Sequence, residues 1–177
     1  MEHDMSRNMS PAAEKSKRKR NQAAKLSREK PLALRKIEKI LSKSKTYLGA
    51  LYLSSFKDLL VKAKKYSLII FCDNHWFCIF STEKTFEIFD PLGFLQKSKC
   101  FSLEFLNFIR AQIGRKVLYS NPKVQGDSSF ACGYFVCFFI LSRELGHSFN
   151  EIISKFSKNF RKNQTLVKLF LEKLIKK

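Results

Sequence analysis

Three short runs of β-branched and aromatic residues, separated only by turn residues, constrain the fold more than any other feature. The runs are SLIIFC at 67–72, WFCIFS at 76–81 and TFEIF at 85–89. Asp73 and Asn74 separate the first two runs, and STEK at 81–84 separates the second from the third. Connections this short join antiparallel neighbours. The sequence therefore predicts an antiparallel meander.

Helical patterns surround this meander. Apolar residues recur at helical spacing over 34–41, and SLEFLNFIRAQIG at 102–114 starts at a serine and closes at a glycine. The stretch 46–65 is interpreted as a loop or short strand followed by a helical turn. Further predictions are a strand at 116–120, a buried helix at 132–145 and one or two amphipathic helices within 148–176. This order predicts an α+β domain, with a small, mostly antiparallel sheet packed by helices.

Residues 1–30 differ in composition from the rest of the chain. They contain KSKRKR at 15–20 and almost no large apolar residues, so they are predicted to form a flexible tail, with one folded domain over 31–177. The tail is interpreted equally well as solvated chain, a nuclear signal or a nucleic-acid contact. The candidate contact residues are Lys15, Lys17, Arg18, Lys19 and Arg20.

The charge extends beyond this tail. The 177-residue chain has a formal net charge of +19, and residues 31–177 alone hold 25 basic and 11 acidic residues. Such an excess favours a polyanionic partner, and DNA is the expected one.

The five cysteines indicate a reduced protein. Their number is odd and the N-terminus lacks an apolar leader, which favours an intracellular chain over a disulfide scaffold. The spacing between Cys72 and Cys78 and between Cys132 and Cys137 does not fit a zinc knuckle, so no metal is expected. The longest apolar run, 130–141, is too short to span a bilayer, so no membrane association is expected.

Three residues form a candidate catalytic group. Cys132 lies at the predicted start of a helix, where unpaired N–H groups and the helix dipole stabilise a thiolate. His75 starts the second strand of the meander, and Asp90 follows the third. Antiparallel strands with a short connection bring these two residues to one sheet edge, where a carboxylate can orient an imidazole. Taken singly, each has a structural reading as well: a core cysteine, a surface histidine and a turn aspartate.

Three further residues accompany this group. Gln125 precedes Cys132 across a loop, and its side-chain amide is a candidate oxyanion donor together with the backbone N–H of Cys132. Gly133 leaves room beside the thiol for a substrate carbonyl, and Trp76 is a candidate positioning residue next to His75. The ordered set His–Asp–Gln–Cys is far more specific than any single member.

Three motifs together resemble the adenovirus protease (adenain) family. VQGDSSFACGYFVCFF at 124–139 resembles the active-site segment of that family, and NHWFCIF and EIFDPLGF resemble its His–Trp strand and its acidic-Pro-x-Gly-Phe turn. The stretch from 34 to 56 is also similar to the start of the family domain. The resemblance covers roughly 31–145, and related proteases occur in Maverick/Polinton-type elements and other large DNA viruses.

The resemblance implies a cysteine endopeptidase with papain-like active-site geometry. His75 would be the base, Asp90 would orient it where the adenoviral enzyme has a glutamate, Gln125 would help form the oxyanion hole, and Cys132 would attack the scissile carbonyl. The implied substrates are capsid and core precursors cut at glycine-containing sites during virion maturation. The implied setting is a monomer in the host nucleus or the virion, with DNA as an activator and no cofactor required for the chemistry.

One departure from the family concerns its activating peptide, which the adenoviral enzyme holds through a disulfide. The matching cysteine would fall near Gly114, which cannot form the bond, and Cys100 is not aligned with it. The sequence therefore argues against an activator of that kind.

Two other functions remain open at this point. One is a SUMO- or ubiquitin-like-specific protease of the same clan; those enzymes usually carry an acidic residue before the cysteine, where this chain has Ala131. The other is a basic DNA-binding or packaging protein with a vestigial protease site, against which the intact His75, Asp90, Gln125 and Cys132 argue.

Overall fold

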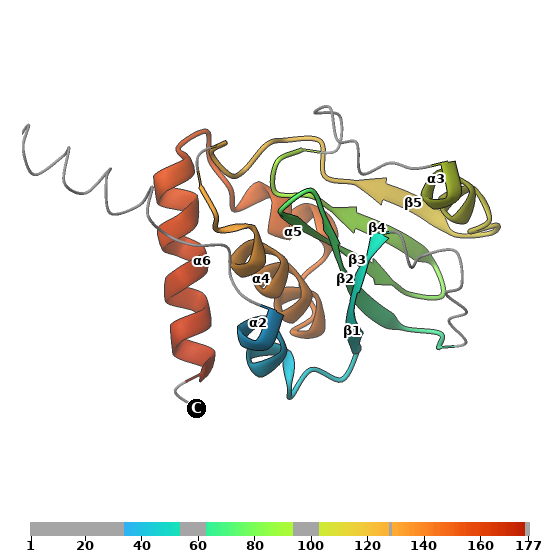
Figure 1. The fold of residues 1–177 in the computed structure, drawn as a ribbon, viewed down its shortest axis with the longest axis horizontal. Coiled ribbons are helices and arrows are strands. Elements are labelled where there is room, and N and C mark those ends of the chain that lie inside the picture. Colours follow the sequence, from blue (N-terminus) through green and yellow to red (C-terminus); the bar gives the residue numbers. More distant parts are fainter. Residues whose placement is uncertain (1–33, 54–62, 94–102, 128, 176–177) are drawn as a thin grey trace, which may run out of the picture.

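The computed structural model describes residues 34–53, 63–93, 103–127 and 129–175. Figure 1 shows a curved sheet with helices on both faces. The helices are α2 (Leu34–Leu41), α3 (Leu103–Arg110), α4 (Cys132–Glu144), α5 (Phe149–Ser154) and α6 (Phe160–Ile175), and the strands are β1 (Tyr47–Tyr52), β2 (Tyr66–Cys72), β3 (His75–Ser81), β4 (Thr85–Phe89) and β5 (Lys116–Tyr119). The α+β class predicted from the sequence is confirmed.

The sheet has five strands in the order β1-β2-β3-β4-β5. The predicted meander is confirmed, because β2 pairs antiparallel with β3, and β3 antiparallel with β4. The two outer pairings, β1 with β2 and β4 with β5, are parallel. The prediction of a mostly antiparallel sheet is therefore wrong, and the sheet is mixed. Parallel neighbours need long crossover connections, so local turn signals could not reveal them.

The turn between β2 and β3 sets the position of His75. Asp73 and Asn74 both adopt positive φ, at 48° and 60°. Two consecutive left-handed residues make the tight hairpin turn that Asn and Asp tolerate best among non-glycine residues. Cys72 therefore pairs directly with His75 across the hairpin, and His75 is fixed at the very end of the sheet.

Helix α4 is the centre of the larger core. It packs on β3 and is flanked by α2 and α6. Its apolar residues point in all directions, as expected for a helix covered on every side. The opposite face of the sheet carries a second core, in which Phe105 and Ile109 of α3 cover Phe77 and Ile79 of β3.

The cysteines partly contradict the expectation of a fully reduced chain. Cys78, Cys132 and Cys137 are free and buried, as expected. Cys72, however, is disulfide-bonded. The odd cysteine count carries no information on which thiols come close in space, and so could not predict this bond.

Two sequence predictions concern residues that are described only in part or not at all. The stretch 46–65 begins with β1, which settles its first part as a strand, and the predicted helical turn falls largely outside the described residues. The basic tail at 1–30 lies wholly outside them. No helix in the described part of the chain is long and apolar enough to cross a membrane.

Candidate active site

Cys132 is the first residue of α4, as the sequence predicts. The preceding residue, Ala131, has no side-chain oxygen, so no side chain caps this helix. An uncapped N-terminus leaves its N–H groups and dipole available to a thiolate. Cys137 lies within the same helix but is fully buried, and burial raises the pKa of its thiol strongly. The two thiols of α4 therefore differ in environment, and only Cys132 lies at the N-terminus of the helix.

His75 and Asp90 form a buried pair at the sheet edge. The Nε2 atom of His75 lies 2.7 Å from Oδ1 of Asp90. The two residues are only 8% and 3% exposed. The predicted proximity of these residues is confirmed, and it follows from the meander, since His75 starts β3 and Asp90 directly follows β4.

Cys132 lies within hydrogen-bonding reach of the same imidazole. Burial alone would lower the pKa of His75, but the hydrogen bonds to Asp90 and Cys132 and their negative charge outweigh it and raise the pKa to about 9. An imidazolium with this pKa keeps its proton at neutral pH beside the sulfur atom. The three residues thus form a chain in the order Cys132, His75, Asp90.

The raised pKa of His75 also couples stability to pH. Because its pKa is about 9 when folded and about 6.5 when unfolded, protonated His75 stabilises the fold fully below about pH 6.5. That contribution is lost as the pH rises toward 9. The site is therefore most stable in its protonated form.

The turn after β4 holds Asp90 in place. Its backbone N–H donates to Ser120 Oγ at 2.8 Å, and its Oδ1 accepts from the backbone N–H of Leu92 at 2.8 Å. Gly93 closes the turn with a φ of 88°, and a Cβ there would lie 3.2 Å from the carbonyl oxygen of Asn121. Glycine is thus required both for its backbone angle and for the close approach of the next loop.

Gln125 lies in the loop that leads from β5 to α4. Its backbone N–H and that of Val124 both donate to the carbonyl oxygen of Pro91, the residue after Asp90. Its side chain is buried, and Nε2 donates to the carbonyl oxygen of Ser129. An amide nitrogen carries two hydrogens, so one N–H is committed to the loop and the second remains for an oxyanion. The oxyanion role stays a prediction.

Helix α6 holds this loop from the other side. Asn163 is buried, and its Nδ2 donates to the carbonyl oxygen of Val124 at 2.9 Å and to that of Ser157 at 2.8 Å. Gln164 accepts a hydrogen bond from Ser129 Oγ. The loop bearing Gln125 is therefore clamped between the turn at Pro91 and α6.

The remaining sequence candidates are placed as follows. Gly133 is buried in the first turn of α4. Trp76 is 6% exposed and packs against Phe71 in a tilted arrangement, with ring centroids 4.4 Å apart; its Nε1 has no hydrogen-bond partner among the described residues. Lys15, Lys17, Arg18, Lys19 and Arg20 lie outside the described residues. Within the described ranges, no group of three or more His, Cys, Asp or Glu residues is arranged to hold a metal ion.

Comparisons with known proteins show the fold alone. No protein-family model and no curated protein sequence matches this chain. Among solved structures, the central domain of the uncharacterized Lpg1148 protein from Legionella pneumophila is similar, with a TM-score of 0.53 at 13% identity. The match covers 84% of this chain and 97% of that one. At this identity the likeness extends to the α+β architecture and not to activity.

Sequence reasoning missed two residues that shape the site. Ser120 holds the backbone of Asp90 from 30 residues away, and Asn163 holds that of Val124 from 39 residues away. Ser120 ends the strand predicted at 116–120, and Asn163 lies in the stretch predicted to form amphipathic helices, so neither position indicated a role in the site. The one available signal was the Asn-Gln pair at 163–164 on α6, but no rule of spacing connects it to a particular loop.

Proposed function

We propose that this protein is a cysteine peptidase, with Cys132 as nucleophile, His75 as acid and base, and Asp90 as the residue that orients His75. The observation that carries this proposal is the buried His75–Asp90 hydrogen bond, together with the interaction of the same imidazole with Cys132 in the first turn of α4. Asp90 holds the imidazole in one orientation, and the adjoining imidazolium and helix N-terminus favour the thiolate.

The chemistry follows from these positions. The Cys132 thiolate attacks the scissile carbonyl carbon, and the carbonyl electron pair moves onto its oxygen. His75 donates its proton to the leaving amine as the C–N bond breaks and a thioester forms. The neutral imidazole then takes a proton from water, whose oxygen attacks the thioester. The acid product leaves, the thiolate is restored and the imidazolium is regenerated.

The oxyanion requires donors on the same side as the thiol. The backbone N–H of Cys132 and the free N–H of the Gln125 amide are the proposed pair. The clamp formed by Pro91 and Asn163 supports this assignment, because an oxyanion donor stabilises developing charge only when its position is fixed before the reaction.

The substrate class rests on the resemblance to adenain-type proteases. We propose endopeptidase action on viral precursor proteins at glycine-containing sites during virion maturation, in the host nucleus or the particle. The excess of basic residues supports DNA as the activating partner. Contacts to DNA phosphates would make such activation weaken with salt.

The test is the initial rate of cleavage of a glycine-containing peptide library by the wild type, Cys132→Ala and Cys137→Ala. The Cys132 variant should lose all measurable turnover, a fall on the order of 10⁶-fold by analogy with removal of other covalent nucleophiles. Cys137→Ala should retain activity, because that thiol is in the core. Turnover by Cys132→Ala would contradict the proposal.

The same assay separates the class of protease and the role of DNA. Adding double-stranded DNA should raise the wild-type rate at low salt and not at high salt. A rate indifferent to DNA would remove the DNA-activation part and leave the peptidase. Cleavage of a SUMO fusion in preference to the glycine-containing peptides would instead place the protein among the ubiquitin-like-specific proteases.

A further inference from the structure

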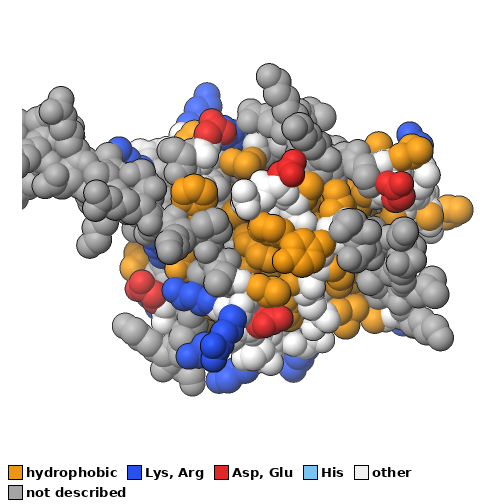
Figure 2. Space-filling view, viewed as in Figure 1, with side chains coloured by type: hydrophobic (Ala, Val, Ile, Leu, Met, Phe, Trp, Pro, Cys, Tyr) orange, Lys and Arg blue, Asp and Glu red, His pale blue; other side chains and the backbone are white. Residues whose placement is uncertain are grey.

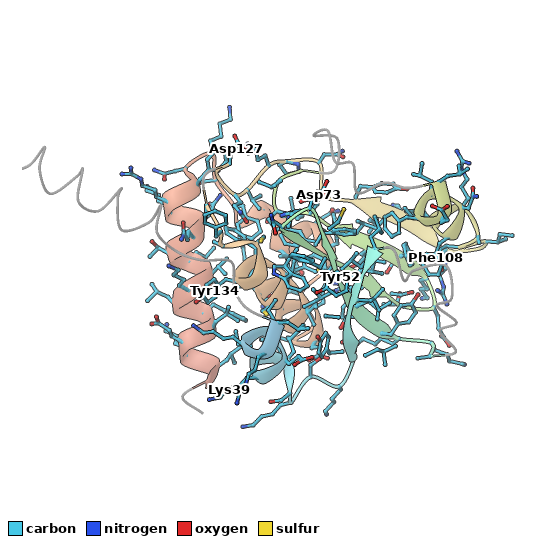
Figure 3. The ribbon with its side chains drawn as sticks, viewed as in Figure 1. Lys39, Tyr52, Asp73, Phe108, Asp127 and Tyr134 are labelled. Atoms are coloured by element: carbon cyan, nitrogen blue, oxygen red, sulfur yellow. The ribbon has the colours of Figure 1, made fainter. Side chains whose placement is uncertain are left out.

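A lysine-rimmed groove lies at the opposite end of α4 from Cys132. Two adjoining cavities of about 440 and 250 Å³ meet there and share Lys43, Leu141 and Leu174. They lie where α2, α4 and α6 all end, next to the start of β2. Figure 3 shows Lys39 at the foot of α2, beside the end of α6. A cavity of this size is large enough for several apolar side chains of a bound ligand.

The floor of the groove is aliphatic. It is formed by Ile40, Leu141, Leu145 and Leu174. Leu145 is 61% exposed, so much of this aliphatic surface is open to water. Apolar side chains of a partner could cover this floor and remove it from water.

The rim is strongly basic. All of its lysines are exposed, and Figure 2 shows basic side chains gathered over α2. None of them forms an ion pair within the described part of the chain, in contrast to Lys64, which pairs with Glu83. The rim lysines are Lys36, Lys39, Lys43, Lys45 and Lys65.

Negative charge in the groove does not balance this rim. Glu144 is the one acidic residue that lines the two cavities within the described ranges. Its Oε1 already accepts from Ser44 Oγ and from the backbone and side chain of Thr46. The three helix C-termini add about half a negative charge each. Five ammonium groups outweigh these contributions, so the groove is complementary to an acidic ligand.

The form of the groove favours a peptide over a nucleic acid. Among the described residues, its lining contains no aromatic residue on which a base could stack and no arginine for bidentate phosphate contacts. An aliphatic floor offers nothing to a phosphate backbone. A segment with leucine-type residues on one face and carboxylates on either side satisfies both floor and rim.

We propose that this groove docks an acidic, amphipathic segment of a partner protein. The inference is independent of the peptidase proposal, because it uses no residue of the Cys132 site. The docked segment would lie a full length of α4 from the thiol, about 20 Å for its 13 residues. The groove is thus a binding surface separate from the catalytic centre.

The experiment measures fluorescence anisotropy of a labelled peptide with the full-length protein. The probe is a helix-forming peptide of about 15 residues built from leucine on one face and glutamate and alanine elsewhere. A scrambled peptide of the same composition is the reference for non-specific attraction. Neither peptide contains glycine, so neither offers the proposed cleavage site. The amphipathic peptide should bind more tightly than the scrambled one.

Two matched charge reversals locate the binding site. Lys39→Glu with Lys43→Glu should weaken binding of the amphipathic peptide at least about tenfold, since rim charges become repulsive. Lys158→Glu with Lys162→Glu makes the same change in net charge at the other end of α6 and should change binding little. Equal binding of both peptides, or equal loss in both double variants, would overturn the proposal. Loss of binding to a DNA duplex or to phosphatidylserine vesicles in the first double variant, without loss of peptide binding, would also overturn it.

Discussion

Two buried ion pairs have their carboxylates close together in the chain, one at Glu87 within β4 and the other at Asp90 directly after it. The two pairs differ in what their cationic partners contact. Glu87 pairs with Arg143 of α4 through both carboxylate oxygens, at 2.7 and 2.9 Å, and also accepts from Thr85 Oγ1. Asp90, at the end of the same strand, pairs with His75 through Oδ1. Both carboxylates are almost completely buried.

The two pairs differ in the further groups that the cationic residue contacts. Arg143 lies over the ring of Phe80 and donates to the carbonyl oxygen of His147, so its donors are used within the fold. His75 instead interacts with the thiol of Cys132. The Glu87–Arg143 pair holds α4 against β4. The His75–Asp90 pair instead adjoins the thiol of Cys132. Burial alone does not distinguish the structural Glu87–Arg143 pair from the proposed catalytic pair; the identity of the third partner does.

Among the three substitutions that test this comparison, Asp90→Asn should have the largest effect on activity. The amide removes the negative charge that helps to keep His75 protonated and correctly oriented, so the peptidase rate should fall by about 10³–10⁴-fold, as for the same change in serine protease triads. In the wild type, the rate should decline as the pH rises through about 9, because the imidazolium loses its proton.

The pH profile of the rate distinguishes two roles of Asp90, which either orients and charges His75 or only stabilises the turn after β4. In Asp90→Asn, the alkaline limb should move to lower pH by about 1–3 units, the usual influence of a close opposite charge. The measurement is kcat/KM between pH 5 and 10 for both proteins. An unchanged alkaline limb would show that Asp90 is only a turn residue.

Glu87→Gln should instead affect stability. It leaves the Arg143 guanidinium buried without its counter-ion, which typically costs about 3–5 kcal/mol in the free energy of unfolding. Urea denaturation of the wild type and the variant measures this loss. At a temperature where the variant stays folded, its alkaline limb should match that of the wild type. A shifted limb would mean that the two pairs are electrically coupled, and the proposed division of roles would fail.

Asn163→Ala should have the smallest effect of the three and act on both quantities. It leaves the carbonyl oxygens of Val124 and Ser157 without their donor, a cost of about 1–3 kcal/mol. The loop with Gln125 should then be less well fixed, and kcat should fall more than KM rises.

The control is Asn159→Ala, just before the start of α6. Its side chain caps the Lys162 N–H and does not contact the Gln125 loop in the described structure. This variant should lose stability and retain kcat. Equal kcat losses in both variants would show that α6 acts through general stability.

Local signals account for what the sequence predicted correctly. The proximity of His75 and Asp90 followed from two short turns, and the position of Cys132 followed from the small residues before an apolar helix. In each case the determining residues are close together in the chain, so turn chemistry and periodicity were enough.

Long-range pairings account for what the sequence did not predict. The parallel pairings of β1 with β2 and of β4 with β5 depend on crossover connections, which short turn signals do not reveal. The contact of Arg143 with Glu87 joins residues 56 apart, and that of Asn163 with Val124 joins residues 39 apart. The sequence contains many polar residues that could form such contacts, and only the packing of the folded chain determines which of them meet.

The origin of the catalytic residues also bears on the order of folding. His75 and Asp90 are 15 residues apart and belong to one meander, whose local contacts close at low entropic cost. Cys132 joins them only when α4 docks on the sheet. The His75–Asp90 pair can therefore assemble while the nascent chain is still incomplete. Cys132, the proposed nucleophile, is the last of the three residues to reach its position. In terms of the proposed function, an unfinished chain would therefore hold no active site.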